Sequence, residues 1–281
     1  MWFPLAQEVG ETSLLETLAK SSISSVLIFA FVCTLIRAGT HYLYHKLPDY
    51  ERHTGKAKAY RVIDGLADSL VYAAIVVFML VRPYFIQTFR IPTESMVGTL
   101  LVGDVLIVDK LTYRYSDPKF GDIVVFKPPL RALMPGWDPN TDYVKRLIGE
   151  PGQVVEIRDS ALYIDGKRVE EPYVHEKVFG DFKLVNRDGE LLPLMRGMVY
   201  GRYTLTNQHS PIEYQVSPEE AEELWKLPAE KIPPRHYLLI GDNRNYSNDG
   251  RAWGLVPRES VVGKAWIRIF PFKRMGRADS R

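Results

Sequence analysis

The chain has 281 residues, of which 46% are hydrophobic and 25% are charged, and its net charge is +2. This ordinary globular usage excludes wholesale disorder, a collagen-like fibre and a transporter with many membrane spans. Lys plus Arg (36) nearly equals Asp plus Glu (34), which argues against a nucleic-acid partner. The only cysteine, Cys33, excludes an intrachain disulfide and a thiolate metal cluster.

Two uncharged apolar segments stand near the N-terminus, at residues 21–36 and 69–81. A membrane-spanning helix needs about 20 mostly apolar residues, and long cations at its ends can extend to the interface. Since Arg37 and Arg82 stand at such ends, we predict membrane helices over 21–37 and 66–87. Two buried core helices are the alternative. The acidic N-terminus does not suit a cleavable signal peptide, so the first helix is expected to remain as an anchor.

Charge asymmetry predicts the orientation of these helices. Residues 37–61 hold six Lys or Arg against two acidic residues, whereas residues 1–20 have a net charge of −2. Because cytoplasmic loops carry the excess of Lys and Arg, the basic loop 38–65 is expected in the cytoplasm. The tail 1–20 and the whole of 88–281 would then lie on the opposite side.

Residues 88–281 have the pattern of antiparallel β structure. Runs of β-forming residues alternate with Gly, Pro and Asp, and Asp165-Gly166 between two short runs predicts a two-residue hairpin. Ser217 and Glu220 form a capping box for one helix that is expected to end near Leu227. Residues 173–235 are otherwise polar and irregular, as in an insertion on a compact β core.

Three short stretches gather the residues that carry chemistry, at 91–100, 143–152 and 241–257. The first contains Ser95, the second contains Lys145 between apolar strand neighbours, and the third is rich in Asn, Asp, Gly and Ser. Each has an ordinary structural explanation when taken alone: a turn serine, a lysine that extends to solvent, and a loop with an ion pair.

Together the three stretches resemble bacterial signal peptidase I, a membrane-bound Ser/Lys endopeptidase of the peptidase S26 type that removes secretory signal peptides. The Ser-Met-x-x-Thr-Leu box, the Tyr-Val-Lys-Arg box and the Gly-Asp-Asn-Arg box occur in the family's order. The resemblance implies a mainly β catalytic domain of the signal-peptidase and SOS-repressor type, preceded by two transmembrane helices. It also implies a multi-pass protein of the bacterial inner membrane, with its catalytic domain on the periplasmic side. The resemblance is weakest over 153–235, which is expected to be a family-variable insertion.

The resemblance assigns Ser95 as the nucleophile of an acyl-enzyme mechanism and Lys145 as its general base. Thr93 would join the Ser95 backbone N–H in the oxyanion hole, and Ser247 would orient the lysine. Ion pairs that brace the site without touching substrate are expected from four residues: Arg146, Asp242, Asp249 and Arg251. Substrate contacts are expected from eight: Phe89, Ile91, Pro92, Met96, Leu100, Asp142, Tyr143 and Val144.

The physical demand on Lys145 is severe. A serine hydroxyl is a weak nucleophile without a base, and a lysine acts as a base only when it is neutral. Free lysine titrates near 10.4, and burial can lower its pKa by several units. The fold is therefore expected to bury Lys145.

Two residues depart from the family's pattern. Glu94 stands where a glycine usually precedes the nucleophile, so a positive φ would strain it, and its carboxylate would favour the protonated lysine. Gly98 replaces the usual proline and is expected to loosen the turn.

The expected partners are secretory precursors with small residues at positions −1 and −3, the lipid bilayer and, as a further candidate, the secretion translocon. No cofactor and no metal are expected, since the histidines are scattered, at 41, 45, 53, 175, 209 and 236. A catalytically impaired, membrane-anchored β-module that binds exported peptides is the alternative function. A soluble self-cleaving repressor would share the β core and the Ser/Lys pair, but not the apolar N-terminal segments.

Overall fold

The structure is a computed structural model, and it describes residues 23–52, 55–77, 84–133, 141–176, 178, 180–196 and 218–279. The chain divides into two compact units, Met1–Gln87 and Thr88–Arg281, and each is described by itself. The predicted tail 1–20 and the capping residue Ser217 lie outside the described residues.

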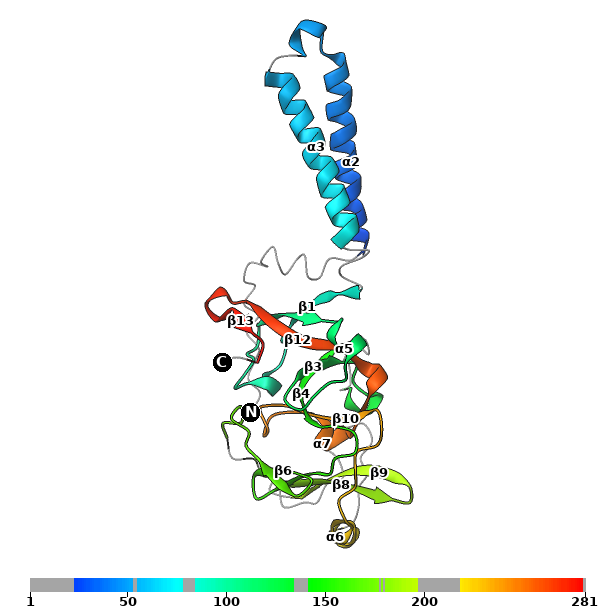
Figure 1. Cartoon of the computed structure of the whole chain (residues 1–281), viewed down its shortest axis with the longest axis vertical. Helices are drawn as coiled ribbons and strands as arrows, with labels where there is room; N and C mark the ends of the chain where they lie inside the picture. The colour runs from blue at the N-terminus through cyan, green and yellow to red at the C-terminus, as the bar shows by residue number, and fades with distance from the viewer. Residues whose placement is uncertain are drawn as a thin grey trace, which may run out of the picture. The chain divides into compact units, whose positions relative to one another are not determined.

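The first unit is a helical hairpin of α2 (Ile23–Lys46) and α3 (Gly55–Ile75), joined through the 3₁₀ turn η1 (Asp49–Glu51) (Figure 1). Small or short side chains, among them Cys33, Ala57 and Ala67, are buried between the helices. Arg37 on α2 forms ion pairs with two aspartates of α3, Asp64 and Asp68. Packing and charge thus hold the two helices together.

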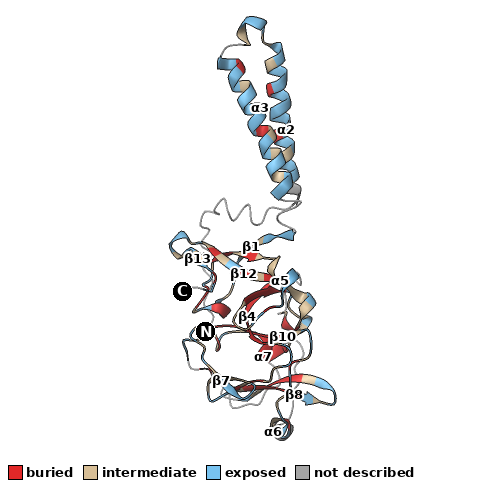
Figure 2. Ribbon diagram, viewed as in Figure 1, coloured by how far each residue is buried: buried red, intermediate tan, exposed pale blue. Residues whose placement is uncertain are grey.

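Most of this hairpin is exposed (Figure 2). Its exposed residues include the large apolar Leu27, Phe31, Leu66 and Leu70. Within the described residues, one helical segment, Val26–Lys46, is long and apolar enough to cross a membrane, with a mean hydropathy of 1.6. A second span over 66–87 is not confirmed, and residues 78–83 of it lie outside the described part of the chain.

Both helices extend into the predicted loop 38–65, since α2 continues to Lys46 and α3 already begins at Gly55. Charged residues such as Lys56 and Lys58 are good helix formers, so the charges that mark a membrane boundary do not end a helix. The charge pattern therefore does not predict where these helices end.

The second unit is built on an antiparallel sheet of eight strands in the order β1-β2-β12-β3-β4-β10-β11, with β13 beside β12 (Figure 1). The strands are β1 (Ile86–Arg90), β2 (Val105–Asp109), β3 (Ile123–Phe126), β4 (Tyr143–Gly149), β10 (His236–Ile240), β11 (Val256–Pro257), β12 (Val261–Phe270) and β13 (Gly276–Arg277). The mainly antiparallel β fold is as predicted.

A second antiparallel sheet has five strands in the order β7-β6-β5-β8-β9. They are β5 (Val155–Arg158), β6 (Ala161–Ile164), β7 (Lys167–Val169), β8 (Asp181–Arg187) and β9 (Glu190–Arg196). Asp165 and Gly166 both have positive φ, 51° and 75°, as the predicted β6–β7 hairpin requires.

The strands β8 and β9 correct the expectation that residues 173–235 are irregular. Pro193 lies on β9, an edge strand of the sheet, and pairs with Leu184 of β8. A proline is tolerated there because its missing N–H faces away from the ladder. The helix α6 (Pro218–Lys226) ends close to the predicted Leu227.

Strand β4 runs through the centre of the core, and all seven of its residues are buried. Tyr143 and Leu147 pack with Phe126 and Trp253, the last residue of α7 (Gly250–Trp253). The side chains on the opposite face of β4 enter two other clusters: Val144 packs with Ile91 and Met96, and Ile148 packs with Val155 and Phe182. The remaining short helices are α5 (Thr112–Tyr115), η3 (Glu94–Met96), η4 (Leu130–Ala132), η5 (Arg258–Ser260) and η6 (Phe272–Arg274). Any polar residue on β4 is therefore carried into the interior.

Candidate active site

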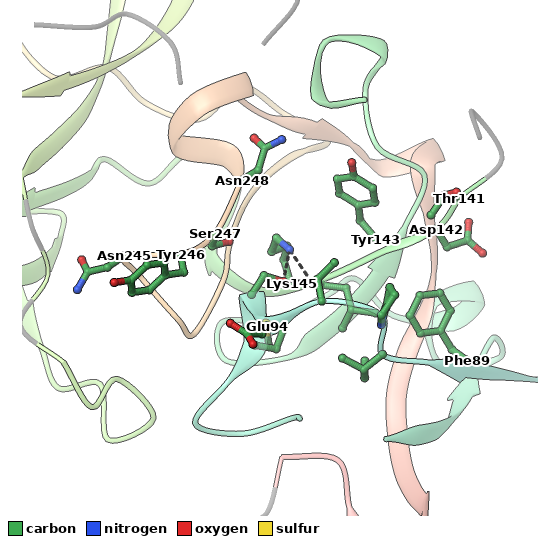
Figure 3. Close-up of a pocket in the computed structure, with 16 residues that line it drawn as sticks. Phe89, Glu94, Thr141, Asp142, Tyr143, Lys145, Asn245, Tyr246, Ser247 and Asn248 are labelled. Carbon is green, nitrogen blue, oxygen red and sulfur yellow. Dashed lines mark hydrogen bonds between the residues drawn. The ribbon is translucent and has the colours of Figure 1, made fainter. Parts of the chain in front are cut away.

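The three motif stretches meet at one pocket of about 400 Å³ (Figure 3). Its lining comes from β1 and η3, from the start of β4, and from the loop between β10 and α7. The lining residues are Phe89, Ile91, Pro92, Thr93, Glu94, Ser95, Met96, Thr141, Asp142, Tyr143, Val144, Lys145, Asn245, Tyr246, Ser247 and Asn248.

Ser95 and Lys145 touch at the floor of this pocket. Ser95 lies on η3 and Lys145 lies on β4, and Lys145 Nζ donates a hydrogen bond to Ser95 Oγ at 2.7 Å. Both residues are buried, with exposed fractions of 7% and 4%. Nζ also donates to the carbonyl oxygen of Val144 at 3.2 Å and lies 5.6 Å from the centre of the Tyr143 ring.

Burial lowers the pKa of Lys145 to about 8. Asp249 and Asp242 oppose this shift because their negative charges favour the ammonium, whereas the positive charge of Arg251 supports it. The strand thus supplies the desolvation that a lysine base needs. Glu94 is not one of the carboxylates that raise the pKa of Lys145.

Thr93 Oγ1 lies 3.3 Å from Ser95 Oγ, on the wall of the pocket. The backbone of Thr93 is extended and leads directly into η3, so its hydroxyl and the Ser95 hydroxyl face the same space. The Ser95 carbonyl oxygen accepts a hydrogen bond from the N–H of Asn243 at 3.1 Å, which fixes η3 to the loop after β10.

Ser247 lines the pocket, but the predicted hydrogen bond to Lys145 is not formed in this structure. Its Oγ is buried, and its side chain interacts with the Asp249 carboxylate, whose pKa it helps to lower. Lys145 donates instead to Ser95 and to the Val144 carbonyl. A side chain on Gly241 would place its Cβ 2.3 Å from Ser247 Oγ and 2.5 Å from the Ser95 carbonyl oxygen. The glycine therefore lets the two serine segments approach each other.

Two buried ion pairs lie behind the pocket. Arg146 donates to both oxygens of Asp242, at 2.8 and 2.6 Å, and Thr99 Oγ1 donates to the same carboxylate at 2.6 Å. Arg251 donates to both oxygens of Asp249, each at 2.9 Å. None of these groups lines the pocket, so each acts on the site from outside it.

Asp249 is held in its ionised form. Burial alone would raise the pKa of its carboxyl, but Arg251 and a hydrogen bond from the Gly241 N–H, at 3.0 Å, keep that pKa below its usual range. Asp249 also caps α7, because its side chain accepts a hydrogen bond from the backbone N–H of Arg251.

Seven of the eight predicted substrate residues line the pocket, and Leu100 is the exception. Leu100 has no exposed surface and packs in the core with Leu106 and Val108, so its assignment as a substrate contact is wrong. It follows the turn after η3, and that turn directs the chain back toward β2. Asp142 at the pocket rim forms an ion pair with Lys127 at 2.8 Å.

The two departures from the family's pattern fit the backbone without strain. Glu94 is exposed on η3, and its φ is not positive, so the expected strain is absent. Gly98 has a φ of +108°, which proline cannot adopt. A Cβ at Gly98 would lie 2.8 Å from His175 Cδ2 and 3.1 Å from the Tyr173 carbonyl oxygen. The turn is closely packed rather than loosened.

Sequence reasoning missed several residues around the site. Arg244 belongs to the Gly-Asp-Asn-Arg box but was given no role, and it pairs with Glu171, at 2.8 Å for its Nη1. The Tyr173 ring lies 3.9 Å from the Arg146 guanidinium carbon. Nothing in the segment around 171 marks it as part of the site. The missed lining residues are Thr141, Asn245, Tyr246 and Asn248.

No group of three or more metal-ligating side chains occurs among the residues that the structure describes. The pocket holds a hydroxyl in contact with an amine whose pKa is lowered to about 8. That pair can transfer an acyl group.

Comparisons with known proteins show which family this chain resembles. Residues 65–270 match the family described as "Signal peptidase, peptidase S26". A "Probable signal peptidase I-1" of Synechocystis is 31% identical over 211 residues, which is 75% of this chain and 85% of that protein. A "Signal peptidase I" of Aquifex aeolicus is 32% identical over 72% of this chain and 83% of its own length. A crystal structure of a signal peptidase I from Enterococcus faecalis aligns with 53% of this chain and 97% of that chain, at 25% identity and a TM-score of 0.31.

Replacing the buried lysine is expected to stabilise the fold. The pKa of Lys145 falls from 10.5 to about 8 on folding. Protonated Lys145 therefore costs the native state at most about 3 kcal/mol below pH 8. Lys145→Met should raise the free energy of unfolding by about 1–3 kcal/mol at pH 7, after the loss of its hydrogen bonds.

Between pH 8 and 10.5 Lys145 is neutral in the native state but still protonated in the unfolded chain, so the wild type gains stability over that window and the advantage of Lys145→Met disappears above it. Denaturant titrations at pH 7 and pH 10.5 measure both effects. A variant that is less stable than the wild type at pH 7 would contradict this account.

The close approach at Gly241 gives a second expectation. Gly241→Ala must displace Ser247 or the Ser95 carbonyl, since real Cβ contacts do not reach 2.3 Å. We expect the Ser95–Lys145 contact to be lost, with a fall in any hydrolytic activity of about 100-fold or more. Gly65→Ala is the control, because its Cβ would meet nothing within 4 Å. Equal activity in the two variants would show that the close approach is unimportant.

Proposed function

This chain belongs to the signal peptidase family, peptidase S26, and on that premise we propose that it is a membrane-anchored serine endopeptidase that cleaves N-terminal signal peptides from exported precursors. Ser95 is the nucleophile and Lys145 is the general base. The observation that carries the proposal is the 2.7 Å contact between Lys145 Nζ and Ser95 Oγ inside a buried pocket.

The reaction proceeds in two acyl transfers. Neutral Lys145 takes the proton of Ser95 as its Oγ attacks the scissile carbonyl carbon, and the oxyanion accepts hydrogen bonds from the Ser95 N–H and the Thr93 hydroxyl. Lys145 then gives its proton to the leaving amine as the peptide bond breaks. In the second step Lys145 takes a proton from water, which attacks the ester, and Ser95 recovers its hydrogen as the signal peptide departs.

The bracing groups give this chemistry its geometry. Asp242 and Asp249 are each neutralised by an arginine, so neither forms an ion pair that would keep Lys145 charged. Ser247 is proposed to orient Lys145 once substrate fills the pocket, since its buried side chain lines the same pocket as Lys145. A seryl hydroxyl suits this role because it both donates and accepts hydrogen bonds.

The signal peptide binds as an extended strand along β1 and the start of β4. Such a strand forms main-chain hydrogen bonds, and its alternate side chains enter pockets. Ile91, Met96 and Val144 make the wall apolar and closely packed. Side chains larger than alanine at positions −1 and −3 would clash with this wall. The remaining proposed substrate contacts are Phe89, Pro92, Asp142 and Tyr143.

The protein is proposed to sit in the bacterial plasma membrane. The segment Val26–Lys46 and the apolar surface of the hairpin support an anchor in the bilayer. We infer a second span within 66–87, a cytoplasmic basic loop, and an extracytoplasmic tail and catalytic unit, from the excess of Lys and Arg in residues 37–61. In that position the catalytic unit meets precursors as they leave the secretion translocon.

The decisive experiment is cleavage of a precursor with an Ala-x-Ala site by the detergent-solubilised protein. We expect cleavage to rise with pH through a midpoint near 8, because only neutral Lys145 accepts the proton of Ser95. Ser95→Ala and Lys145→Ala should each lower kcat by at least about 1000-fold. Gel analysis of the processed precursor measures both.

Two conservative variants serve as controls for these losses. Lys183→Met removes another buried lysine, which donates to the Trp225 and Leu227 carbonyls far from the pocket, and it should keep activity. Ser116→Ala removes a hydroxyl that bonds only within its own turn. If the wild type cleaves no precursor at any pH, the alternative of a peptide-binding module replaces this proposal.

The charge of the pocket predicts a substrate preference. Asp142 is paired with Lys127, whereas no ion pair to Glu94 occurs within the described part of the chain. In Figure 3, Glu94 lies toward Tyr246 and Ser247, away from Phe89. Precursors with Lys rather than Glu at the second position after the cut should show about two- to fivefold higher kcat/KM.

Glu94→Gln should abolish this preference, and 0.5 M salt should reduce it, because exposed charges are screened. Glu190→Gln, at the exposed end of β9, is the control that should retain the preference. Equal rates for the Lys and Glu substrates in the wild type would rule out a role of Glu94 in selectivity.

A further inference from the structure

One short segment outside the three motif stretches contacts all of them. Residues 171–175, which we call the connecting segment, follow β7. At the nucleophile stretch, the Tyr173 carbonyl and the His175 ring lie so close to Gly98 that a Cβ there would be 3.1 and 2.8 Å from them. The connecting segment thus packs directly on the turn that follows Ser95.

The same segment contacts the lysine strand. The Tyr173 ring lies against the Arg146 guanidinium, with 3.9 Å between the ring centre and the Cζ atom. Arg146 Nη2 donates to Asp242, and Arg146 Nη1 donates to the Gly121 carbonyl at 2.7 Å. Such stacking on a desolvated guanidinium is worth up to about 2 kcal/mol.

Its third contact is with the loop that carries Ser247. Both Glu171 oxygens accept hydrogen bonds from Arg244, and the side chains of the pair are only 9% and 1% exposed. Tyr173 Oη donates to Glu171 Oε1 at 2.8 Å, which fixes the carboxylate in place. Removal of Glu171 would destabilise the fold, because it would leave the charge of Arg244 buried and uncompensated.

Arg244 leads in turn to the groups that set the charge around the catalytic lysine. Its carbonyl oxygen accepts a hydrogen bond from Arg251 Nη2 at 2.6 Å, and Arg251 is bidentate on Asp249. The charged groups that act on Lys145 are Asp249, Asp242 and Arg251, while Ser95 and the Tyr143 ring are its other close contacts. Asp249 also attracts Arg244.

We propose that Glu171 is a positioning residue for the reaction: it neutralises Arg244, so that Asp249, already paired with Arg251, is not drawn to a second arginine and keeps its effect on Lys145. This role rests on the proposed function of the site. Without Glu171, the buried Arg244 cation has Asp249 as its remaining carboxylate. The pull of Asp249 on the Lys145 ammonium is then weakened, and a positive charge is added nearby. Both effects disfavour protonated Lys145.

The test is Glu171→Gln in the full-length, detergent-solubilised protein. We expect the pKa of Lys145 to fall by about half a unit or more, and the acid limb of the pH profile to move down with it. We expect kcat to fall about 3- to 30-fold as the Ser247 loop loosens, with KM unchanged because Glu171 does not line the pocket. NMR of ¹³C-labelled lysine, assigned with Lys145→Met, reads the pKa without any substrate.

Three variants separate charge from packing. Glu171→Asp keeps the charge and should keep the wild-type midpoint. Glu171→Gln combined with Arg244→Met removes both charges and should return the midpoint toward the wild type, since paired removal leaves no buried cation. Glu259→Gln breaks the exposed Arg235–Glu259 ion pair and should change nothing.

The outcomes are distinct. A lower kcat with an unmoved midpoint would mean that Glu171 acts only as structural support, and the proposal would be overturned. Should Glu171→Gln fail to fold, Arg244→Met is the second test: it removes the cation that Glu171 neutralises and should raise the pKa of Lys145, and an unmoved pKa would overturn the proposal. A wild type that cleaves nothing refutes the proposed function, whereas the NMR titration still decides whether Glu171 tunes Lys145.

Discussion

The contact between Lys145 and Ser95 depends on the burial of an amine that has no carboxylate of its own. Strand β4 carries Lys145 into the interior because every residue on the strand is buried. The aspartates nearby are each engaged by an arginine, so they raise the pKa of Lys145 without forming an ion pair with it. Core packing, the two ion pairs and the loop geometry all keep Lys145 buried without a carboxylate partner. This burial lowers the free energy of unfolding at neutral pH.

The sequence predicted the parts of the site that reside in contiguous motifs. Ser95, Lys145 and Thr93 come together as the resemblance implied, and both bracing ion pairs are present behind the pocket. The antiparallel β core and the Asp165-Gly166 hairpin also followed from local patterns. These features were predictable because short sequence windows contain the residues that decide them.

Features that depend on distant segments could not be predicted in this way. Leu100 is apolar and close to Ser95 in sequence, but only the path of the chain toward β2 shows that it faces the core. Strand β9 contains Pro193, and a proline is compatible with a strand when that strand lies at an edge of its sheet. The local sequence does not show that β9 has this position. Glu171 and Arg244 are 73 residues apart, and no local pattern links them.

Gly98 bears on how the catalytic boxes can be exchanged between relatives. Gly98 has a positive φ, and the His175 ring packs so closely against it that a side chain would not fit. A chimera that receives the proline of other family members at this position would have to receive a different segment at 171–175 as well. The two segments are therefore not independent of each other, and the residues at 171–175 constrain which residue the turn after Ser95 can accept.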